Sequence, residues 1–228
     1  SIKNTMQKEL SSNIDLLQLK LESLVASDLN ELNKITTIAV SKKKSLDHIN
    51  AAYDCGINNF GENYAQELEE KSLQTEKEDI IWHFIGPIQS NKVKIIAKHA
   101  NWVHSLNRES IVEKLNKECG SLNKIINGCI QINISEEETK SGISTSDLFE
   151  FAKFVDSMKN IRLKGIMVLP KIGSKEEMLK SKELHNELIA AYPYAKHLSM
   201  GTTSDFELAI NLGSNMIRVG ELIFGKRL

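Results

Sequence analysis

The chain has 228 residues, of which 41% are hydrophobic and 26% are charged, so it can bury a sizeable core and is not expected to be disordered. Its 29 basic and 30 acidic residues give a formal charge of −1, which excludes a general electrostatic attraction to nucleic acid or to an anionic membrane. No apolar run approaches the roughly 20 residues of a membrane span, and the N-terminus lacks the pattern of a secretory signal. A cytoplasmic protein is therefore expected.

The cysteines and histidines do not show the spacing of a metal site. Cys55, Cys119 and Cys129 form no CxxC pair, and no two of the six histidines form an HxxxH pair. This spacing argues against a disulfide framework and against structural zinc, and no metal site is expected.

The segment 4–25 carries apolar residues three or four positions apart, which predicts an amphipathic helix. From residue 35 onwards, short β-branched runs alternate with helical stretches. The strand-like runs cover 35–42, 57–63, 80–87, 101–106, 127–135, 161–170, 196–202 and 216–225. The helical stretches begin near residues 45, 64, 90, 108, 145, 174 and 204.

This alternation predicts the fold class, which is α/β. Eight strands separated by helices imply parallel strands joined by crossover connections. In a chain of this length they predict one (β/α)8 TIM-type barrel domain over residues 1–228, with an extra helix in 1–30 packed on the barrel. A doubly wound open sheet gives the same local pattern and is the alternative. The count of eight and the absence of GxGxxG after the first strand favour the barrel.

Three consecutive lysines close the first strand-like run, where the chemistry of such barrels is found. Side chains alternate along a strand, so Lys42 is expected to share the face of Val40 and to project into the barrel mouth, whereas Lys43 points outward. Lys44 directly precedes Ser45, a candidate helix N-cap. A solvated basic corner is the alternative for all three lysines.

A second candidate region follows the seventh and eighth strands. The turn SMGTTSDFE is rich in glycine and hydroxyl residues and opens a helix, so its free backbone N–H groups suit a phosphate. An ordinary turn capped by Ser204 or Asp205 is the alternative. Arg218 shares a strand face with Gly220, and a guanidinium buried there needs a partner, either a ligand or an acidic side chain.

A lysine close to a phosphate site indicates an aldehyde phosphate bound as a Schiff base, because imine formation uses a neutral amine. The spacing alone also permits an aldolase that forms an imine with its substrate.

Seven blocks of the chain resemble, in order and spacing, the pyridoxal phosphate homeostasis protein family: AVSK, FGENYAQE, WHFIGPIQSNK, QINISEEETKSG, LKGIMVLP, LSMGTTSDFELAI and IRVGELIFGKR. The match runs from about residue 35 to residue 227. The family shares the barrel of the alanine racemase N-terminal domain. The resemblance implies a protein that binds pyridoxal 5′-phosphate and serves intracellular vitamin B6 homeostasis as a carrier and regulator, without established turnover.

The resemblance also implies the residues of the site. Lys42 would hold the cofactor as an internal aldimine, with Asn63 beside the pyridine ring and Arg218 facing the ring nitrogen. An arginine there disfavours protonation of the ring nitrogen and weakens the ring as an electron sink. The phosphate would be held by four residues: Ser199, Gly201, Thr203 and Gly220.

Two departures from the family pattern and one further lysine bear on this site. The pair Thr202 and Thr203 stands where Met-Ser is common, and the hydroxyl is retained. Glu221 replaces a small hydroxyl residue, so we expect only its backbone N–H to face the cofactor, with the carboxylate turned away. Lys140 could contact or accept the cofactor, or be a solvated loop lysine. We expect His83, with its neighbour Trp82, to pack beneath the site.

A pyridoxal phosphate-dependent racemase of low activity is the alternative function. Full racemases of this fold carry a second, β-rich domain that supplies an opposing acid–base group, whereas this chain stops directly after the eighth strand, so a carrier is expected. The candidate partners are pyridoxal phosphate and the apoenzymes that depend on it. Neither nucleic acid nor a membrane is expected, and a monomer is expected because the domain with the usual racemase dimer contact is missing.

Overall fold

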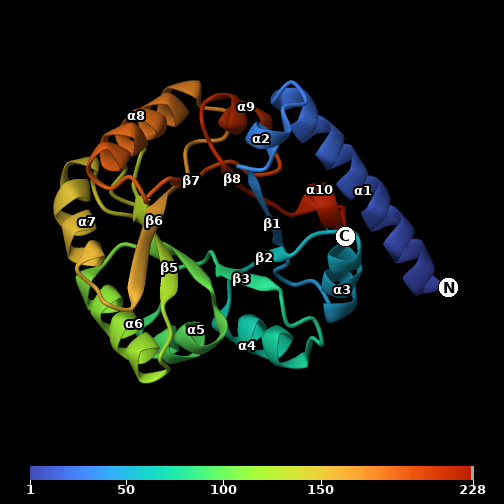
Figure 1. The fold of residues 1–228 in the computed structure, drawn as a ribbon, viewed down its shortest axis with the longest axis horizontal. Helices are drawn as coiled ribbons and strands as arrows, with labels where there is room; N and C mark the ends of the chain where they lie inside the picture. The colour runs from blue at the N-terminus through green and yellow to red at the C-terminus, as the bar shows by residue number, and fades with distance from the viewer. Residues whose placement is uncertain (227–228) are drawn as a thin grey trace.

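The computed structural model describes residues 1–226 and confirms the closed eight-stranded barrel (Figure 1). All neighbouring strands are parallel, and the last strand pairs with the first. The strands are β1 (Thr36–Val40), β2 (Asn59–Glu62), β3 (Ile81–Phe84), β4 (Trp102–Leu106), β5 (Ile126–Ile132), β6 (Ile161–Val168), β7 (His197–Ser199) and β8 (Met216–Val219).

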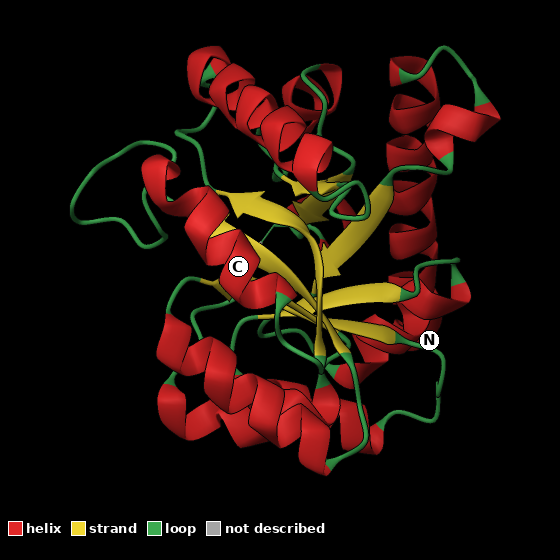
Figure 2. Cartoon of the chain, turned by 60° about the vertical axis from the view of Figure 1, so that its left-hand side comes forward, coloured by secondary structure: helices red, strands yellow, loops and turns green. Residues whose placement is uncertain are grey.

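The helices surround the strands, as the view in Figure 2 shows. They are α1 (Ile2–Leu24), α2 (Leu29–Leu32), α3 (Leu46–Asp54), α4 (Ala65–Gln74), α5 (Val93–His99), α6 (Glu109–Ser121), α7 (Leu148–Asp156), α8 (Lys175–Ala191), α9 (Phe206–Asn211) and α10 (Glu221–Phe224), with the 3-10 turns η1 (Ser90–Lys92) and η2 (Thr145–Asp147). Within residues 1–226, none of these helices combines the length and the apolarity that crossing a bilayer requires.

Alternation along each strand separates two buried layers. Phe60 and Trp82 are neighbours in the outer layer between strands and helices, with ring centroids 6.1 Å apart. The adjacent residues Gly61 and His83 face the barrel interior, where a Cβ on Gly61 would lie 2.9 Å from Ile38. His83 therefore packs below the strand ends as expected, whereas Trp82 lies on the opposite face of the same strand.

The eighth strand is shorter than the sequence indicates. It ends at Val219, and the residues that follow form α10 instead of continuing the strand to 225. Ile223 and Phe224 are buried in α10, and Asn13 of α1 donates a hydrogen bond to Ile223 O at 3.0 Å. A short apolar run has no periodicity that distinguishes a strand from a helix, so the contact with α1 decides the conformation.

Helix α1 lies along the outside of the barrel and contacts α3, α9 and α10 (Figure 1). Four of the five apolar residues whose spacing predicts this helix are buried, namely Leu10, Ile14, Leu17 and Leu21, and the fifth, Met6, is half-buried. The burial of this stripe attaches the N-terminal helix to the end of the chain.

Four histidines are buried enough to be neutral at pH 7. His83 and His104 lie inside the barrel with no exposed surface. Burial lowers the pKa of His83 to about 3 and holds the pKa of His104 well below its ordinary value. Burial likewise lowers the pKa of His185 and that of His197 to about 4 each.

Substitution of the α1 stripe tests its contribution to stability. Leu17 is 3% exposed and Leu16 is 58% exposed, although both belong to the same helix. Leu17→Ala is expected to lower the free energy of unfolding by about 2–5 kcal/mol, and Leu16→Ala by about 0.5 kcal/mol or less, as measured by urea denaturation. Equal effects of the two substitutions would contradict the docking of this helix.

The free energy of unfolding is also expected to fall as the pH is lowered from 8 to 5. The folded state keeps these histidines neutral, whereas the same histidines in the unfolded chain take up protons below about pH 6.5. Protonation of each histidine in the unfolded chain therefore lowers the free energy of unfolding by about 2 kcal/mol between pH 8 and pH 5. Glu62 acts with the opposite sign, because burial raises its pKa to about 7 and the folded state binds that proton first. Four histidines outweigh one carboxyl group, and urea denaturation at both pH values should show a net loss; an equal or higher stability at pH 5 would refute the assignment.

Candidate functional site

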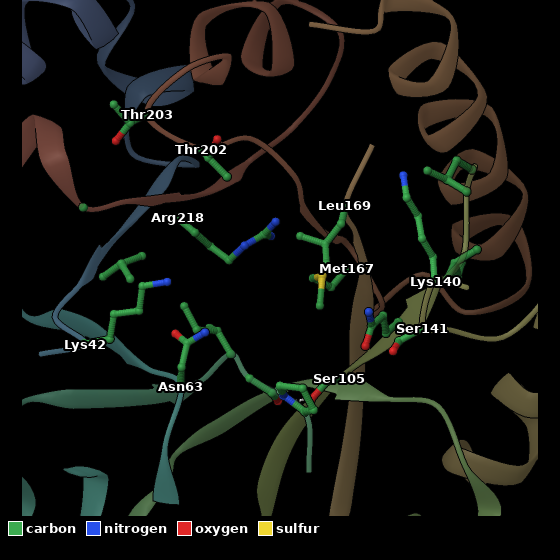
Figure 3. A pocket seen from close by; sticks show the side chains of 18 of the residues that line it. Lys42, Asn63, Ser105, Lys140, Ser141, Met167, Leu169, Thr202, Thr203 and Arg218 are labelled. Atoms are coloured by element: carbon green, nitrogen blue, oxygen red, sulfur yellow. Dashed lines mark hydrogen bonds between the residues drawn. The ribbon is translucent and has the colours of Figure 1, made fainter. Parts of the chain in front are cut away.

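A cavity of about 750 Å³ opens at the carboxyl ends of the strands (Figure 3). Its volume lies in the range of small-molecule binding sites. Five of the seven residues expected to bind the cofactor line this one cavity: Lys42, Asn63, Thr203, Arg218 and Gly220. In Figure 3 the side chains of Lys42, Asn63 and Arg218 extend into the same space.

Two of the expected phosphate residues do not line the cavity. Ser199 and Gly201 are both buried, and the Ser199 hydroxyl accepts a hydrogen bond from Arg218 Nη1. Direct contact of these two residues with a phosphate stays a prediction.

Lys42 was expected to be the last residue of the first strand, but it lies in the turn after that strand. β1 ends at Val40, and Lys42 and Lys43 form a turn in which Lys43 has φ = 59° and an exposed side chain. The alternation of side chains continues across the turn nevertheless, so Lys42 enters the cavity. Ser45 is the N-cap of α3 as predicted, and its hydroxyl accepts a hydrogen bond from His48 N at 3.3 Å.

A buried ionic cluster holds the backbone before Lys42. Lys71 of α4 donates to Ser41 O at 2.8 Å and to Glu62 Oε2 at 2.9 Å. The Ser41 hydroxyl donates to the same Glu62 carboxylate. Glu62 has no exposed surface, so the ammonium and the hydroxyl supply the partners that a buried carboxylate requires.

The same cluster holds the backbone after Lys42. Glu67 Oε2 lies 2.7 Å from Lys71 Nζ and accepts a hydrogen bond from Lys43 N at 2.8 Å. Lys42 is therefore flanked by two anchored residues. Sequence reasoning missed this cluster; the only local signal is the i,i+4 spacing of Glu67 and Lys71, which is common on helix surfaces.

Arg218 is 6% exposed and has no carboxylate within 4.0 Å among residues 1–226. Its Nη1 donates to Ser199 Oγ, and its Nη2 donates to Val168 O at 3.2 Å. Burial lowers the pKa of Arg218 to about 10, which leaves the guanidinium charged at neutral pH. Of the two partners that the sequence left open, an acidic side chain in direct contact is not found in the described chain; the carboxylate of Asp205 acts on the guanidinium only from a longer distance, and the cation faces the cavity.

Three buried polar atoms of residues that line the cavity lack a partner among residues 1–226: Asn63 Oδ1, Asn133 Oδ1 and Thr203 Oγ1. Buried polar groups are rarely left unpaired, so these atoms indicate a ligand. Asp205 occupies the N-cap position of α9, and its side chain accepts from Thr202 N at 3.0 Å and from Gly173 N at 3.3 Å. This carboxylate thereby fixes the turn that presents Thr203.

A glycine contact positions Asn63. A Cβ on Gly86 would lie 2.4 Å from Asn63 O, so only glycine lets the loop after β3 approach this backbone. Ser105 fixes the other side of that loop by donating to Gly86 O. The glycine of the WHFIGP block therefore has a packing role that brings Asn63 to the cavity wall.

Lys140 lines the wall opposite Lys42 (Figure 3). It is exposed, and its Nζ lies 3.3 Å from Ser135 Oγ and 3.8 Å from Glu137 Oε2. Glu221 is at the rim and is also exposed. The direction of its carboxylate relative to a cofactor stays a prediction.

Comparisons with known proteins identify the family of this chain. The family of the alanine racemase N-terminal domain matches residues 25–227. A pyridoxal phosphate homeostasis protein of Haemophilus influenzae is 38% identical over 227 residues, which cover 96% of this chain and 96% of its own length. The Escherichia coli protein of the same name is 39% identical over 204 residues, which cover 85% of this chain and 86% of its own length.

Solved structures give the same relationship. PipY of Synechococcus elongatus with pyridoxal phosphate bound has a TM-score of 0.78 and 29% identity, covering 90% of this chain and 100% of its own. The alanine racemase of Clostridium difficile has a TM-score of 0.75 at 14% identity and shares the fold, and the match covers 96% of this chain and 57% of the racemase. The chain described here belongs to the pyridoxal phosphate homeostasis protein family.

Proposed function

We propose that this protein binds pyridoxal 5′-phosphate in the barrel-mouth cavity, linked covalently to Lys42, and acts as a carrier in vitamin B6 homeostasis. The observation that carries the proposal is the convergence of the Lys42 amine and the Arg218 guanidinium on one cavity whose wall also has unpaired polar atoms. The related PipY, which has pyridoxal phosphate bound, supports the choice of ligand.

The residues present fit this cofactor. When bound, pyridoxal phosphate supplies an aldehyde that condenses with an amine with loss of water. Lys42 provides the amine, and the anchored residues on both sides of it limit where that amine can lie. Asn63 offers an unpaired amide oxygen beside it.

The phosphate would bind in the turn after β7. The Thr203 hydroxyl is buried and unpaired, and a phosphate oxygen supplies the acceptor that it lacks. Gly201 and Gly220 contribute backbone N–H groups in this proposal. The Ser199 hydroxyl is hydrogen-bonded to Arg218, so its predicted contact with the phosphate is not part of this proposal.

Arg218 would limit how strongly the bound cofactor acts as an electron sink. A permanent cation beside the ring nitrogen opposes protonation of that nitrogen, so the ring withdraws electrons less strongly from a bound amino acid. Apoenzymes that depend on the cofactor are the proposed recipients. Sustained interconversion of D- and L-alanine by the purified protein would contradict the carrier.

Absorbance and mass spectrometry test the covalent link. Addition of pyridoxal phosphate is expected to turn the protein yellow, and borohydride reduction should fix the label on the peptide that contains Lys42. Lys42→Ala should abolish both signals, whereas Lys44→Ala should retain them because Lys44 does not line the cavity. A label found mainly on Lys140, or none at all, would contradict the assignment.

Removal of the Thr203 hydroxyl tests the phosphate turn. Thr203→Val keeps the shape of the side chain and is expected to weaken the binding of pyridoxal phosphate about tenfold, the value of one good hydrogen bond. Pyridoxal, which has no phosphate, is the control ligand, and its binding should change little. Titrations that show an equal loss for both ligands would place the hydroxyl elsewhere in the site.

A further inference from the structure

A line of hydrogen-bonded side chains crosses the barrel interior below the cavity. It starts at Arg218 Nη1 and continues to Ser199 Oγ, which lies 2.9 Å from His104 Nδ1. His104 Nε2 lies 2.9 Å from His83 Nδ1, and His83 Nε2 lies 2.9 Å from Asn59 Oδ1. Arg218, Ser199, His104 and His83 are all buried. We call these five residues the interior chain.

The arginine end sets the direction of the hydrogen bonds. A guanidinium can only donate, so Ser199 Oγ accepts from Arg218. His104 is the only other group of residues 1–226 that bonds to this hydroxyl, and a buried hydroxyl hydrogen needs an acceptor. Ser199 therefore donates to His104 Nδ1. The neutral His104 ring then carries its hydrogen on Nε2 and donates to His83 Nδ1.

The asparagine end requires the same direction. Asn59 Nδ2 donates to Asn58 Oδ1 at 3.3 Å, so Asn59 presents its oxygen to His83. His83 must donate from Nε2 and accept at Nδ1, as deduced from the arginine end. Both nitrogens of each ring are used, and an additional proton on either ring would place two donors face to face. The rings are also fixed sterically, since His83 stacks on Trp102 with centroids 5.4 Å apart.

We infer that His104 and His83 are positioning residues, which hold Arg218 through Ser199 so that the guanidinium stays against the ring nitrogen of the bound cofactor. The inference rests on the proposed function for the ligand and on the interior chain for the geometry. Both hydrogen-bond acceptors of Arg218 in the described chain are neutral, namely Ser199 Oγ and Val168 O. The nearby carboxylate of Asp205 acts on the guanidinium without forming an ion pair within 4.0 Å, so the positive charge is only partly offset. The interior chain thereby preserves the cation that faces the cavity.

The interior chain is not a route for protons to the cofactor. Transfer along it would require Arg218 to give up a proton and regain it, and a guanidinium stays protonated at the pH of the cell. Its role is therefore to orient Arg218 and to keep the two rings neutral.

Nuclear magnetic resonance of the ligand-free protein tests the direction. With ¹⁵N-labelled histidine, His83 and His104 are expected to be neutral with the hydrogen on Nε2, and their signals should not titrate between pH 5.5 and 8.5. Burial lowers the pKa of His83 to about 3 and holds the pKa of His104 well below its ordinary value, and neither ring has room for a second proton among its hydrogen-bond partners. A hydrogen on Nδ1 of either ring, or titration in this range, overturns the interior chain as described.

Variants test the effect on the cofactor. His104→Leu removes the acceptor for Ser199, and the affinity for pyridoxal phosphate should fall about tenfold, with the pH midpoint of the bound-cofactor absorbance moving by about one pH unit. His104→Asn keeps an oxygen in the position of Nδ1 and should restore both values to within about threefold.

His185→Leu is the matched control. This histidine of α8 is 2% exposed and bonds to Ala195 O in the connection between α8 and β7, outside the interior chain, so its loss should lower the melting temperature without changing the absorbance midpoint. An unchanged midpoint and affinity in His104→Leu, or an equal change in His185→Leu, refutes the positioning role while the covalent link to Lys42 stands. A wild-type protein that fails to bind pyridoxal phosphate refutes the proposed function and the cofactor part of this inference together.

Discussion

The closure of the barrel between β1 and β8 is the constraint on which the site depends. Thr36 pairs with Met216 and Ile38 pairs with Arg218, so the first and the last strand lie in one fixed register. Since both strands run in the same direction, the turn that carries Lys42 and the strand that carries Arg218 reach the same rim. A shift of this register by one residue would turn Arg218 away from the cavity.

Polar groups are buried on both faces of the strands, and each face supports one cation of the site. On the outer face, the cluster of Glu62, Glu67 and Lys71 anchors the turn around Lys42. On the inner face, neutral partners hold Arg218. The unpaired polar atoms in the cavity wall belong neither to the ionic cluster nor to the partners of Arg218. This distribution is expected of a preorganised ligand-binding site.

The family relationship and the local chemistry answer different questions. Alanine racemase shares the barrel at 14% identity, and such a likeness carries no information about reaction. What this chain does with its cofactor depends on the environment of the pyridine ring. In the proposed complex, a buried guanidinium without a carboxylate within 4.0 Å in the described chain would make that environment more positive and weaken the ring as an electron sink.

The sequence by itself determined the barrel, because eight apolar runs of strand length separated by helical spacing allow few other arrangements. It also identified Lys42 and Arg218, since period-two alternation is a local property that each strand carries in its own residues. It did not reveal the ionic cluster of Lys71, the interior chain through His104, or the helix that replaces the end of β8. Those features depend on which side chains meet across strands and helices distant in the sequence. Only the strand register and the packing of the closed barrel determine these contacts, because the hydrogen-bond partner of a buried polar group is set by proximity in space and not by proximity in the sequence.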